Sequence, residues 1–243
     1  MSNFINKIRE PLKYNRDEFV KEQASLLPRG TKILDVGAGK TPYRHLFEHC
    51  NYYAQDFAQH AGSTEGPMAE KNSWFYGKLD YVCDAISIPV EDESFDAILC
   101  TEVIEHVTHP GSVLQEISRI LKPGGKLILT APLTSGLHQE PHHYFGGFTP
   151  YYYNNRLTDF GFASINVTPN GGFFSFHSQE SQRFSAWITP GRIPLIPSIL
   201  LFPVFVISLP WFRLIYPIVA KYLDELDKHK PFTVGYHVVA IKK

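Results

Sequence analysis

A glycine-rich turn is the first group of residues whose types and spacing suit ligand binding. The turn reads Gly37-Ala38-Gly39, and Asp35 stands two positions before it. Glycine has no Cβ, so the backbone of such a turn can approach a ligand closely when the turn joins a strand to a helix. A carboxylate at Asp35 could face a cationic ligand rather than a pyrophosphate. We therefore expect these four residues to line a ligand site.

Two further aspartates follow at the expected ends of later strands. Asp56 comes 21 residues after Asp35, where a carboxylate can accept hydrogen bonds from ribose hydroxyls. Asp84 follows the next strand and could receive an adenine amine. Any one of these aspartates is as easily explained as a helix cap or a turn former. Their occurrence after successive strands favours a site for an adenosine-containing, cationic cofactor.

A second group combines carboxylates with imidazoles, which accept protons or bind divalent metals. Glu102, Glu105 and His106 have the spacing i, i+3, i+4 and are expected to share one helix face. With His138 from a later loop, they could complete a metal site. The favoured alternative is that His106 is structural, because short motifs give false positives.

The loop that contains His138 also supplies adjacent imidazoles at His142 and His143. A hydroxyl that attacks an electrophile must lose a proton, and a nearby imidazole or carboxylate can accept it. The first candidate for this base is His138, and behind it come His106, Glu102 and His142. Adjacent side chains in an extended loop point apart, so at most one of the pair is expected to meet a substrate.

These residues need a scaffold that brings the ends of several strands together. Apolar runs alternate with amphipathic segments over the first 132 residues, which predicts βαβ units and a parallel sheet. In such a sheet, ligands bind outside the carboxyl ends of the strands. The strands are predicted at 32–36, 52–55, 81–83, 96–100, 126–130, 163–168 and 234–241, and the helices at 14–27, 41–50, 112–121 and 149–160. Segment 58–77 is rich in turn formers and is predicted to be a loop.

Four motifs follow one another in this chain: ILDVGAGKTPYRHLF, YYAQDF, CDAISIPVEDESFDAILCTEVIEHV and LKPGGKLILTAP. In this order they resemble the successive motifs of class I S-adenosylmethionine-dependent methyltransferases, nearest to the group that acts on small molecules, glycans and lipids. The resemblance covers residues 30–170 and the terminal strand. It implies a Rossmann-like α/β fold with a seven-stranded, mostly parallel sheet and helices on both faces. The last strand is expected to be antiparallel, between the fifth and the sixth.

The resemblance also implies roles for single residues. It places Asp35, Gly37 and Gly39 at the methionine moiety of the cofactor, Asp56 at the ribose, Asp84 and Ala85 at the adenine, and Thr101 and Glu102 beside the sulfonium. Ala38 and Phe57 are also expected to bind the cofactor. The E-x-x-E-H pattern is similar to that of metal-assisted O-methyltransferases of catechol-like quinone precursors and of the plant small-RNA 2′-O-methyltransferase. Metal-free relatives carry it too, so S-adenosylmethionine is the expected cofactor and a divalent metal is not favoured.

Composition restricts the class of partner and the location. The net charge is −1 with no run of Lys or Arg, so a nucleic-acid partner is not expected. Three distant cysteines without a CxxC indicate a reducing compartment, and the first ten residues lack the apolar segment of a signal peptide. We therefore expect a cytoplasmic protein. We expect one methyltransferase domain over 1–243, with an apolar insertion at 173–230.

The apolar insertion contains 20 residues without a charge, 193–212, between Arg192 and Arg213. That length could span a membrane, but its prolines interrupt helical hydrogen bonds. Both ends must also return to one sheet, which excludes a single crossing. A re-entrant hairpin or broken helices on the inner membrane face satisfy both conditions, with peripheral contact through 193–220. The alternatives are a lid over the acceptor pocket and a homodimer surface.

The sequence therefore predicts a transferase that moves a methyl group from S-adenosylmethionine to a hydroxyl, or less readily to N or C. The acceptor would be small or membrane-linked, such as a glycan, a lipid-linked sugar or a quinone-type lipid. One alternative is an NAD(P)-dependent oxidoreductase, but Pro42 occupies the third position of the dinucleotide fingerprint. Another is a non-catalytic module that binds the cofactor without turnover.

Overall fold

The computed structural model describes residues 10–60, 75–187 and 194–243. The chain forms two compact units. The first, here called the sheet unit, comprises Glu18–Thr168 and Gly235–Lys243, and the second, the helical unit, comprises Met1–Asp17 and Pro169–Val234. The predicted insertion at 173–230 falls inside the helical unit. That all of 1–243 forms one domain stays a prediction.

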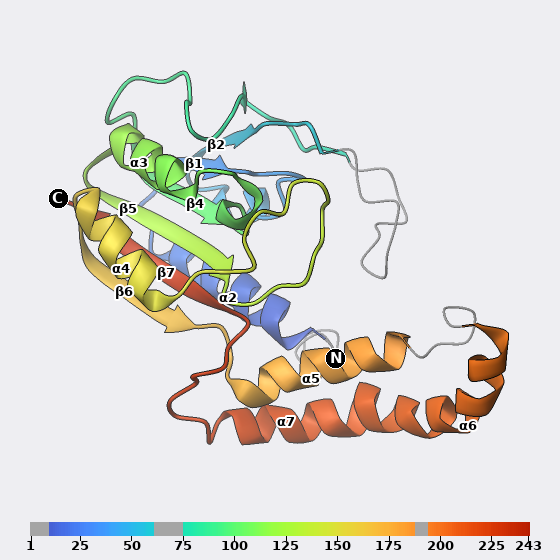
Figure 1. Ribbon diagram of the computed structural model, residues 1–243. Coiled ribbons are helices and arrows are strands. Elements are labelled where there is room, and N and C mark those ends of the chain that lie inside the picture. The colour runs from blue at the N-terminus through green and yellow to red at the C-terminus, as the bar shows by residue number, and fades with distance from the viewer. Residues whose placement is uncertain (1–9, 61–74, 188–193) are drawn as a thin grey trace. The chain divides into compact units, whose positions relative to one another are not determined.

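The sheet unit contains the predicted seven-stranded sheet (Figure 1). Its strands are β1 Lys32–Val36, β2 Asn51–Asp56, β3 Tyr81–Val82, β4 Phe95–Thr101, β5 Leu121–Pro132, β6 Phe162–Pro169 and β7 Gly235–Lys242. They are ordered β3-β2-β1-β4-β5-β7-β6. The strands from β3 to β5 pair in parallel, and β7 is antiparallel to β5. This order confirms the Rossmann-like fold, with the last strand between the fifth and the sixth.

The central strands are apolar because both of their faces are covered. Leu34 of β1 and Ile98 of β4 lie in a core with helices α3 (Pro110–Ile120) and α4 (Pro150–Asp159). Ile33 and Leu99 point to the other face, where they pack with Val20 of α2 (Pro11–Ser25). Alternate side chains of a strand point to opposite faces, so one apolar run serves both cores. The predicted helices on both faces are therefore present (Figure 1).

The helix predicted at 41–50 was wrong. Only a single 3-10 turn, η1 (Arg44–Phe47), forms there. Thr41 has a left-handed backbone with φ of 52°, and Pro42 has no N–H to donate. The left-handed backbone of Thr41 prevents a regular helix from continuing through it, although Phe47 is still fully buried.

Helix α3 begins earlier than predicted. Pro110 occupies its first turn, and Ser112, the expected cap, lies inside the helix. Proline suits this position because the first N–H groups of a helix have no intrahelical partner. Within the predicted loop at 58–77, residues 61–74 lie outside the described part of the chain. Neither 58–60 nor 75–77 forms a helix or a strand.

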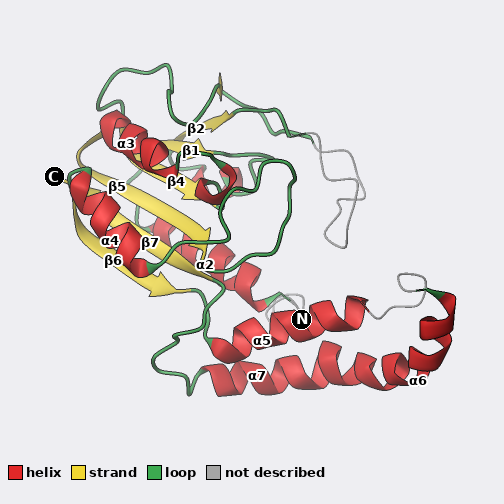
Figure 2. Cartoon of the chain, viewed as in Figure 1, coloured by secondary structure: helices red, strands yellow, loops and turns green. Residues whose placement is uncertain are grey.

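The described part of the helical unit consists mainly of helices (Figure 2). They are α5 Phe173–Trp187, α6 Leu195–Pro210, the π-helical turn η3 Trp211–Ile215 and α7 Tyr216–Asp224, and the first part of α2 also belongs to this unit. Helices α5 and α7 lie side by side, and the turn η3 also contacts α5. The chain therefore folds back on itself, and α5 and α7 form the two arms of a hairpin.

Small side chains let the two helices of this hairpin approach each other. Ser178, Ser181 and Ser185 of α5 are buried, and so is Ala220 of α7. The hydroxyl of Ser181 donates to the carbonyl of Ser178 at 2.8 Å, so burial does not leave it without a partner. The small side chains thus bring the backbones together, and ring contacts of His177 with Tyr216 and of Phe184 with Phe212 complete the packing of α5 against α7 and η3.

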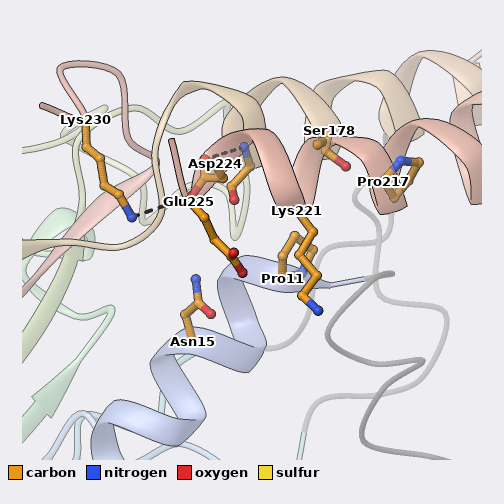
Figure 3. Close-up of a pocket in the computed structure, with 10 residues that line it drawn as sticks. Pro11, Asn15, Ser178, Pro217, Lys221, Asp224, Glu225 and Lys230 are labelled. Carbon is orange, nitrogen blue, oxygen red and sulfur yellow. Dashed lines mark hydrogen bonds and ion pairs between the residues drawn. The ribbon is translucent and has the colours of Figure 1, made fainter. Parts of the chain in front are cut away.

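An aspartate at the end of α7 fixes the start of α5 (Figure 3). The carboxylate of Asp224 is buried and accepts the N–H groups of Gly172 at 3.0 Å and Ser175 at 2.9 Å. Lys230 forms an ion pair with the same carboxylate at 3.6 Å. Negative charge at a helix N-terminus is favourable because the first N–H groups point toward it. Asp224 therefore closes the base of the hairpin.

Candidate active site

The glycine turn after β1 is held by the end of β2. The N–H of Gly37 donates to Oε1 of Gln55 at 3.2 Å, and the N–H of Gly39 donates to Oδ2 of Asp56 at 2.9 Å. Gly37 has φ of 69°, and a Cβ on it would come within 2.3 Å of the Val103 side chain. Both facts require glycine there. Gln55 was not predicted to belong to the site, and its only signal was its place before Asp56.

Asp35 is almost fully buried in β1. Its carboxylate accepts a hydrogen bond from the hydroxyl of Tyr52, a residue that the sequence did not assign to the site. Burial raises the pKa of Asp35 to about 7, and the negative charge of Asp56 adds to that rise. Burial disfavours the ionised carboxylate of Asp35. A cationic ligand beside Asp35 would bind the ionised carboxylate more strongly than the protonated carboxyl. That Asp35 faces the methionine moiety stays a prediction.

Asp56 ends β2 and connects two segments of the site. It is buried, and besides the N–H of Gly39 it accepts the N–H of Ala58 at 2.9 Å. Each carboxylate oxygen has two lone pairs, so both can still accept further hydrogen bonds. The ring of Phe57 next to it meets the ring of His142 edge-on, with centroids 5.2 Å apart. The predicted ribose contact of Asp56 is compatible with these bonds, and it stays a prediction, as does the cofactor contact of Phe57.

The other predicted cofactor residues occupy the ends of β3 and β4. Asp84 is exposed, with Oδ1 accepting the N–H of Ile86 at 3.1 Å, whereas Ala85 is buried in the core. Thr101 is the last residue of β4 and is partly buried. Their contacts with adenine and the sulfonium remain predictions.

Glu102 does not share a helix face with Glu105 and His106, so that expectation was wrong. A 3-10 turn, η2 (Ile104–His106), forms in place of a helix, and Glu102 precedes it. Glu102 has φ of 53°, and its Oε1 accepts the hydroxyl of Thr130 at 2.8 Å. Left-handed backbone is rare for residues other than glycine and occurs often at functional sites. The carboxylate is thus hydrogen-bonded to β5.

Three imidazoles gather where η2 meets the loop after β5. The ring centroids of His106 and His138 are 4.8 Å apart, and those of His138 and His143 are 4.5 Å apart. Nδ1 of His138 lies 2.8 Å from the carbonyl oxygen of Gly136. A carbonyl can only accept, so Nδ1 carries the hydrogen and Nε2 remains an acceptor. His138 therefore has the tautomer that a proton acceptor needs.

His106 is held in the same way. Its Nδ1 donates to the carbonyl of His142 at 2.7 Å, and Nε2 lies 3.7 Å from Oε1 of the buried Glu105. Burial lowers the pKa of His106 to about 4, and the neighbouring His138 and His143 add to that effect. The imidazole is therefore neutral at pH 7, which makes it a weak base. Ligand atoms of Glu105, His106 and His138 all lie within 4.8 Å of one another.

His142 and His143 have different neighbours. The ring of His142 lies against Phe57 and His60, whereas Nε2 of His143 is 3.0 Å from the hydroxyl of Ser135. His143 thus joins the imidazole group and His142 turns to the end of β2. The sequence did not single out His60 or favour His143, because the alternation of a loop does not show which way each ring points.

Comparisons with known proteins find methyltransferases among the proteins similar to this chain. The family described as "Methyltransferase domain" matches residues 34–129. A Ubiquinone biosynthesis O-methyltransferase from Xanthomonas axonopodis pv. citri is 32% identical over 110 residues, covering 44% of this chain and 45% of the relative. One from Xanthomonas oryzae pv. oryzae is 51% identical over 108 residues, covering 42% and 43%. The chain thus matches less than half the length of these curated relatives.

Solved structures support the same fold. A SAM dependent methyltransferase from Archaeoglobus fulgidus superposes with a TM-score of 0.56 at 15% identity, covering 98% of both chains. At that identity the likeness concerns the fold alone. The family match adds the order of motifs, from the glycine turn to β5. Residues 34–129 of this chain thus match a methyltransferase domain, and the fold is that of the class I S-adenosylmethionine-dependent methyltransferases.

Proposed function

We propose that this protein transfers a methyl group from S-adenosylmethionine to a hydroxyl of a quinone-type lipid. The observation that carries the proposal is the group of His106, His138 and His143 at the ends of β4 and β5, in the part of the sheet where this fold binds ligands. The curated relatives named above are O-methyltransferases of ubiquinone biosynthesis. A catechol-like hydroxyl is an acceptor that needs a base beside the transferred methyl.

Each group of residues in the site would have a separate role in the reaction. Bound S-adenosylmethionine would supply an electrophilic methyl group. The backbone of the glycine turn would position it, with Asp35 and Asp56 holding its charged and hydroxyl groups. Nε2 of His138 would accept the proton of the acceptor hydroxyl. Alignment and proton removal are the two contributions that such a displacement requires of the protein.

A divalent metal is a second candidate for the same imidazole group. Glu105, His106 and His138 offer one carboxylate and two imidazoles, a donor set typical of metal sites. Nε2 of His106 and the carboxylate of Glu105 are both acceptors at 3.7 Å, and a cation between them would remove their repulsion. A bound ion would lower the pKa of the acceptor hydroxyl. Of the four predicted ligands, Glu102 is not in this set.

The acceptor can be tested with methyl-tritiated S-adenosylmethionine and a prenylated catechol in detergent micelles. We expect label in the organic-extractable fraction, and little label on glycans or soluble amines. Label confined to the aqueous fraction would reject a lipid acceptor, and no label with any acceptor would favour a cofactor-binding module. Addition of EDTA separates the two catalytic schemes, because a His138 base tolerates the chelator and a metal site does not.

The raised pKa of Asp35 predicts how cofactor affinity depends on pH. Below pH 7 the carboxyl is protonated and loses its attraction for the cationic cofactor, so we expect the affinity for S-adenosylmethionine to fall as the pH drops from 8 to 5. The fall should approach about tenfold per pH unit below the pKa. Titration calorimetry of wild type and Asp35→Asn checks it. The variant should bind weakly and lack this dependence, and an equal slope in both proteins would refute the assignment.

To methylate a lipid acceptor, the enzyme must bind to the membrane that contains it. We propose that it does so as a peripheral protein on the cytoplasmic face, through the apolar part of the helical unit. Ile196–Asp224 is long and apolar enough to cross a bilayer by length and composition, and only 11% of its most apolar window is buried. Homodimerisation through the same surface is the alternative.

A further inference from the structure

The exposed apolar side chains of the helical unit are concentrated in α6 and the turn η3. They are Ile196, Ile199, Leu200, Leu201, Phe202, Val204, Val206, Ile207, Trp211, Leu214 and Ile215. Soluble monomers rarely expose apolar patches of this extent unless the patch has a partner. The question is which partner fits it.

The distribution of these side chains around α6 distinguishes a bilayer from a second protein copy. Leu200, Leu201 and Phe202 are consecutive and are 73%, 38% and 53% exposed. Consecutive residues of a helix point about 100° apart, so these three alone cover more than half of its circumference. A dimer buries one stripe of a helix, whereas hydrocarbon covers all sides. The pattern around α6 therefore fits lipid better than it fits a flat protein surface.

The charges around residues 194–212 also favour a bilayer as the partner. Among the residues from 184 to 187 and from 194 to 212, none is charged. Between Glu180 and Asp224 the sequence has no acidic residue, and its charged residues there are Arg183, Arg192, Arg213 and Lys221. Cations that flank an apolar segment complement the anionic headgroups of a membrane surface. Trp211 and Tyr216 beside Arg213 add the aromatic rings that favour this boundary.

One hydroxyl within residues 194–212 and one beside them have hydrogen-bond partners. The hydroxyl of Ser208 donates to the carbonyl of Phe205 at 2.9 Å, and that of Ser185 donates to the carbonyl of Gln182 at 2.8 Å. Apart from the interruptions at Pro203 and Pro210, the helical backbone closes its own hydrogen bonds, which hydrocarbon requires. The hydroxyl of Ser208 therefore does not enter hydrocarbon unpaired.

The two strands that flank the helical unit in the sequence limit how deeply residues 194–212 can enter a bilayer. Strands β6 and β7 are neighbours in the sheet, and the hydroxyl of Thr168 donates to the carbonyl of His237. The chain between them thus leaves and returns on one side of a membrane. Helix α5 carries Glu180 and Arg183 and is too polar to serve as a second crossing. Insertion is therefore confined to one leaflet, roughly 15 Å of hydrocarbon.

We propose that residues 194–212 form a tip that inserts into one leaflet of an anionic bilayer, with Trp211 and Arg213 at the headgroup level. This proposal deepens the proposed function, since its purpose is access to a lipid acceptor, but the insertion itself needs neither cofactor nor acceptor. It is therefore testable by binding alone.

The test is flotation of the full chain with vesicles of phosphatidylethanolamine and phosphatidylglycerol, without S-adenosylmethionine. We expect wild type to float and the variant Leu200→Lys/Ile207→Lys to lose at least tenfold in vesicle affinity, because two charges would enter hydrocarbon. The matched control is Leu226→Lys. Leu226 is as exposed as Leu200 and Ile207, at 73%, but lies after α7 between acidic residues, so this variant should float like wild type.

Two further measurements keep the outcome clear. All three substituted side chains are exposed, so melting temperature and adenosylhomocysteine binding should stay at the wild-type values. Sedimentation of lipid-free wild type reports its oligomeric state. A dimer that the tip substitutions dissociate, or wild type that stays at the bottom of the gradient, overturns the insertion. Floating protein that methylates no lipid leaves insertion intact and rejects the proposed function alone.

Discussion

Replacing His138 by alanine is expected to lower kcat by about 10²- to 10⁴-fold while cofactor affinity stays unchanged. Nδ1 of His138 donates to the carbonyl of Gly136, so Nε2 is the atom that we propose accepts the proton of the acceptor hydroxyl. His138 belongs to the loop after β5, whereas the glycine turn that would hold the cofactor follows β1. Steady-state kinetics with a catechol-like acceptor, together with calorimetry of adenosylhomocysteine, measures both quantities.

The control for this prediction is another histidine of the same unit. His109 is exposed and makes no side-chain cap of α3, so His109→Ala should keep wild-type kcat. Added imidazole should partly restore the His138→Ala variant, because it can supply a base in the space that the ring leaves. A kcat within threefold of wild type would exclude His138 as the base. Loss of a bound ion without rescue by imidazole would assign it to the metal site.

Replacing Asp56 by alanine is expected to weaken cofactor binding by about 10- to 150-fold, equivalent to about 1.4–3 kcal/mol. The carboxylate is buried, is predicted to accept the ribose hydroxyls, and also accepts the N–H groups of Gly39 and Ala58. The variant thus loses a ligand contact and loosens the turn that carries the rest of the cofactor site. Calorimetric titration with adenosylhomocysteine gives the affinity directly.

Two variants separate these contributions. Asp56→Asn keeps acceptor oxygen but loses the charge, so it should fall between wild type and alanine. Asp92→Ala removes an exposed aspartate whose partner is Arg119, and its affinity should match that of wild type. An Asp56→Ala protein with unchanged affinity and an unchanged melting temperature would remove Asp56 from the ribose site.

The strands could be predicted from the sequence because strands that are buried on both faces consist mainly of apolar residues. Segments such as 32–36 are apolar on both faces, and they are buried on both faces in the sheet. The glycine turn was recognisable because its φ values admit few other residues. The order of the strands followed from the resemblance to a known fold, and the pairing of β5 with β7 confirms it.

The hydrogen-bond partners of side chains on neighbouring strands could be identified only from the tertiary structure. Tyr52 reaches Asp35, and Gln55 reaches Gly37, only because β1 and β2 pair in one particular register. A shift of the register by one residue would turn each of these side chains to the other face. The direction of Glu102 likewise depends on Thr130, which is distant in the sequence.

The same distinction applies to the imidazoles and to the apolar segment. Composition shows that 193–212 carries no charge, but the exposure of these residues depends on which helices pack beside them. In the described part of the chain, α5 packs mainly against α7 and η3 and makes few contacts with α6. Spacing placed His138, His142 and His143 in one loop, but the loop's path decided which rings meet His106. Local sequence thus determined the strands, the turn and the absence of charge. Contacts between distant residues decided the site and its partners, because their free energy depends on packing that no single segment encodes.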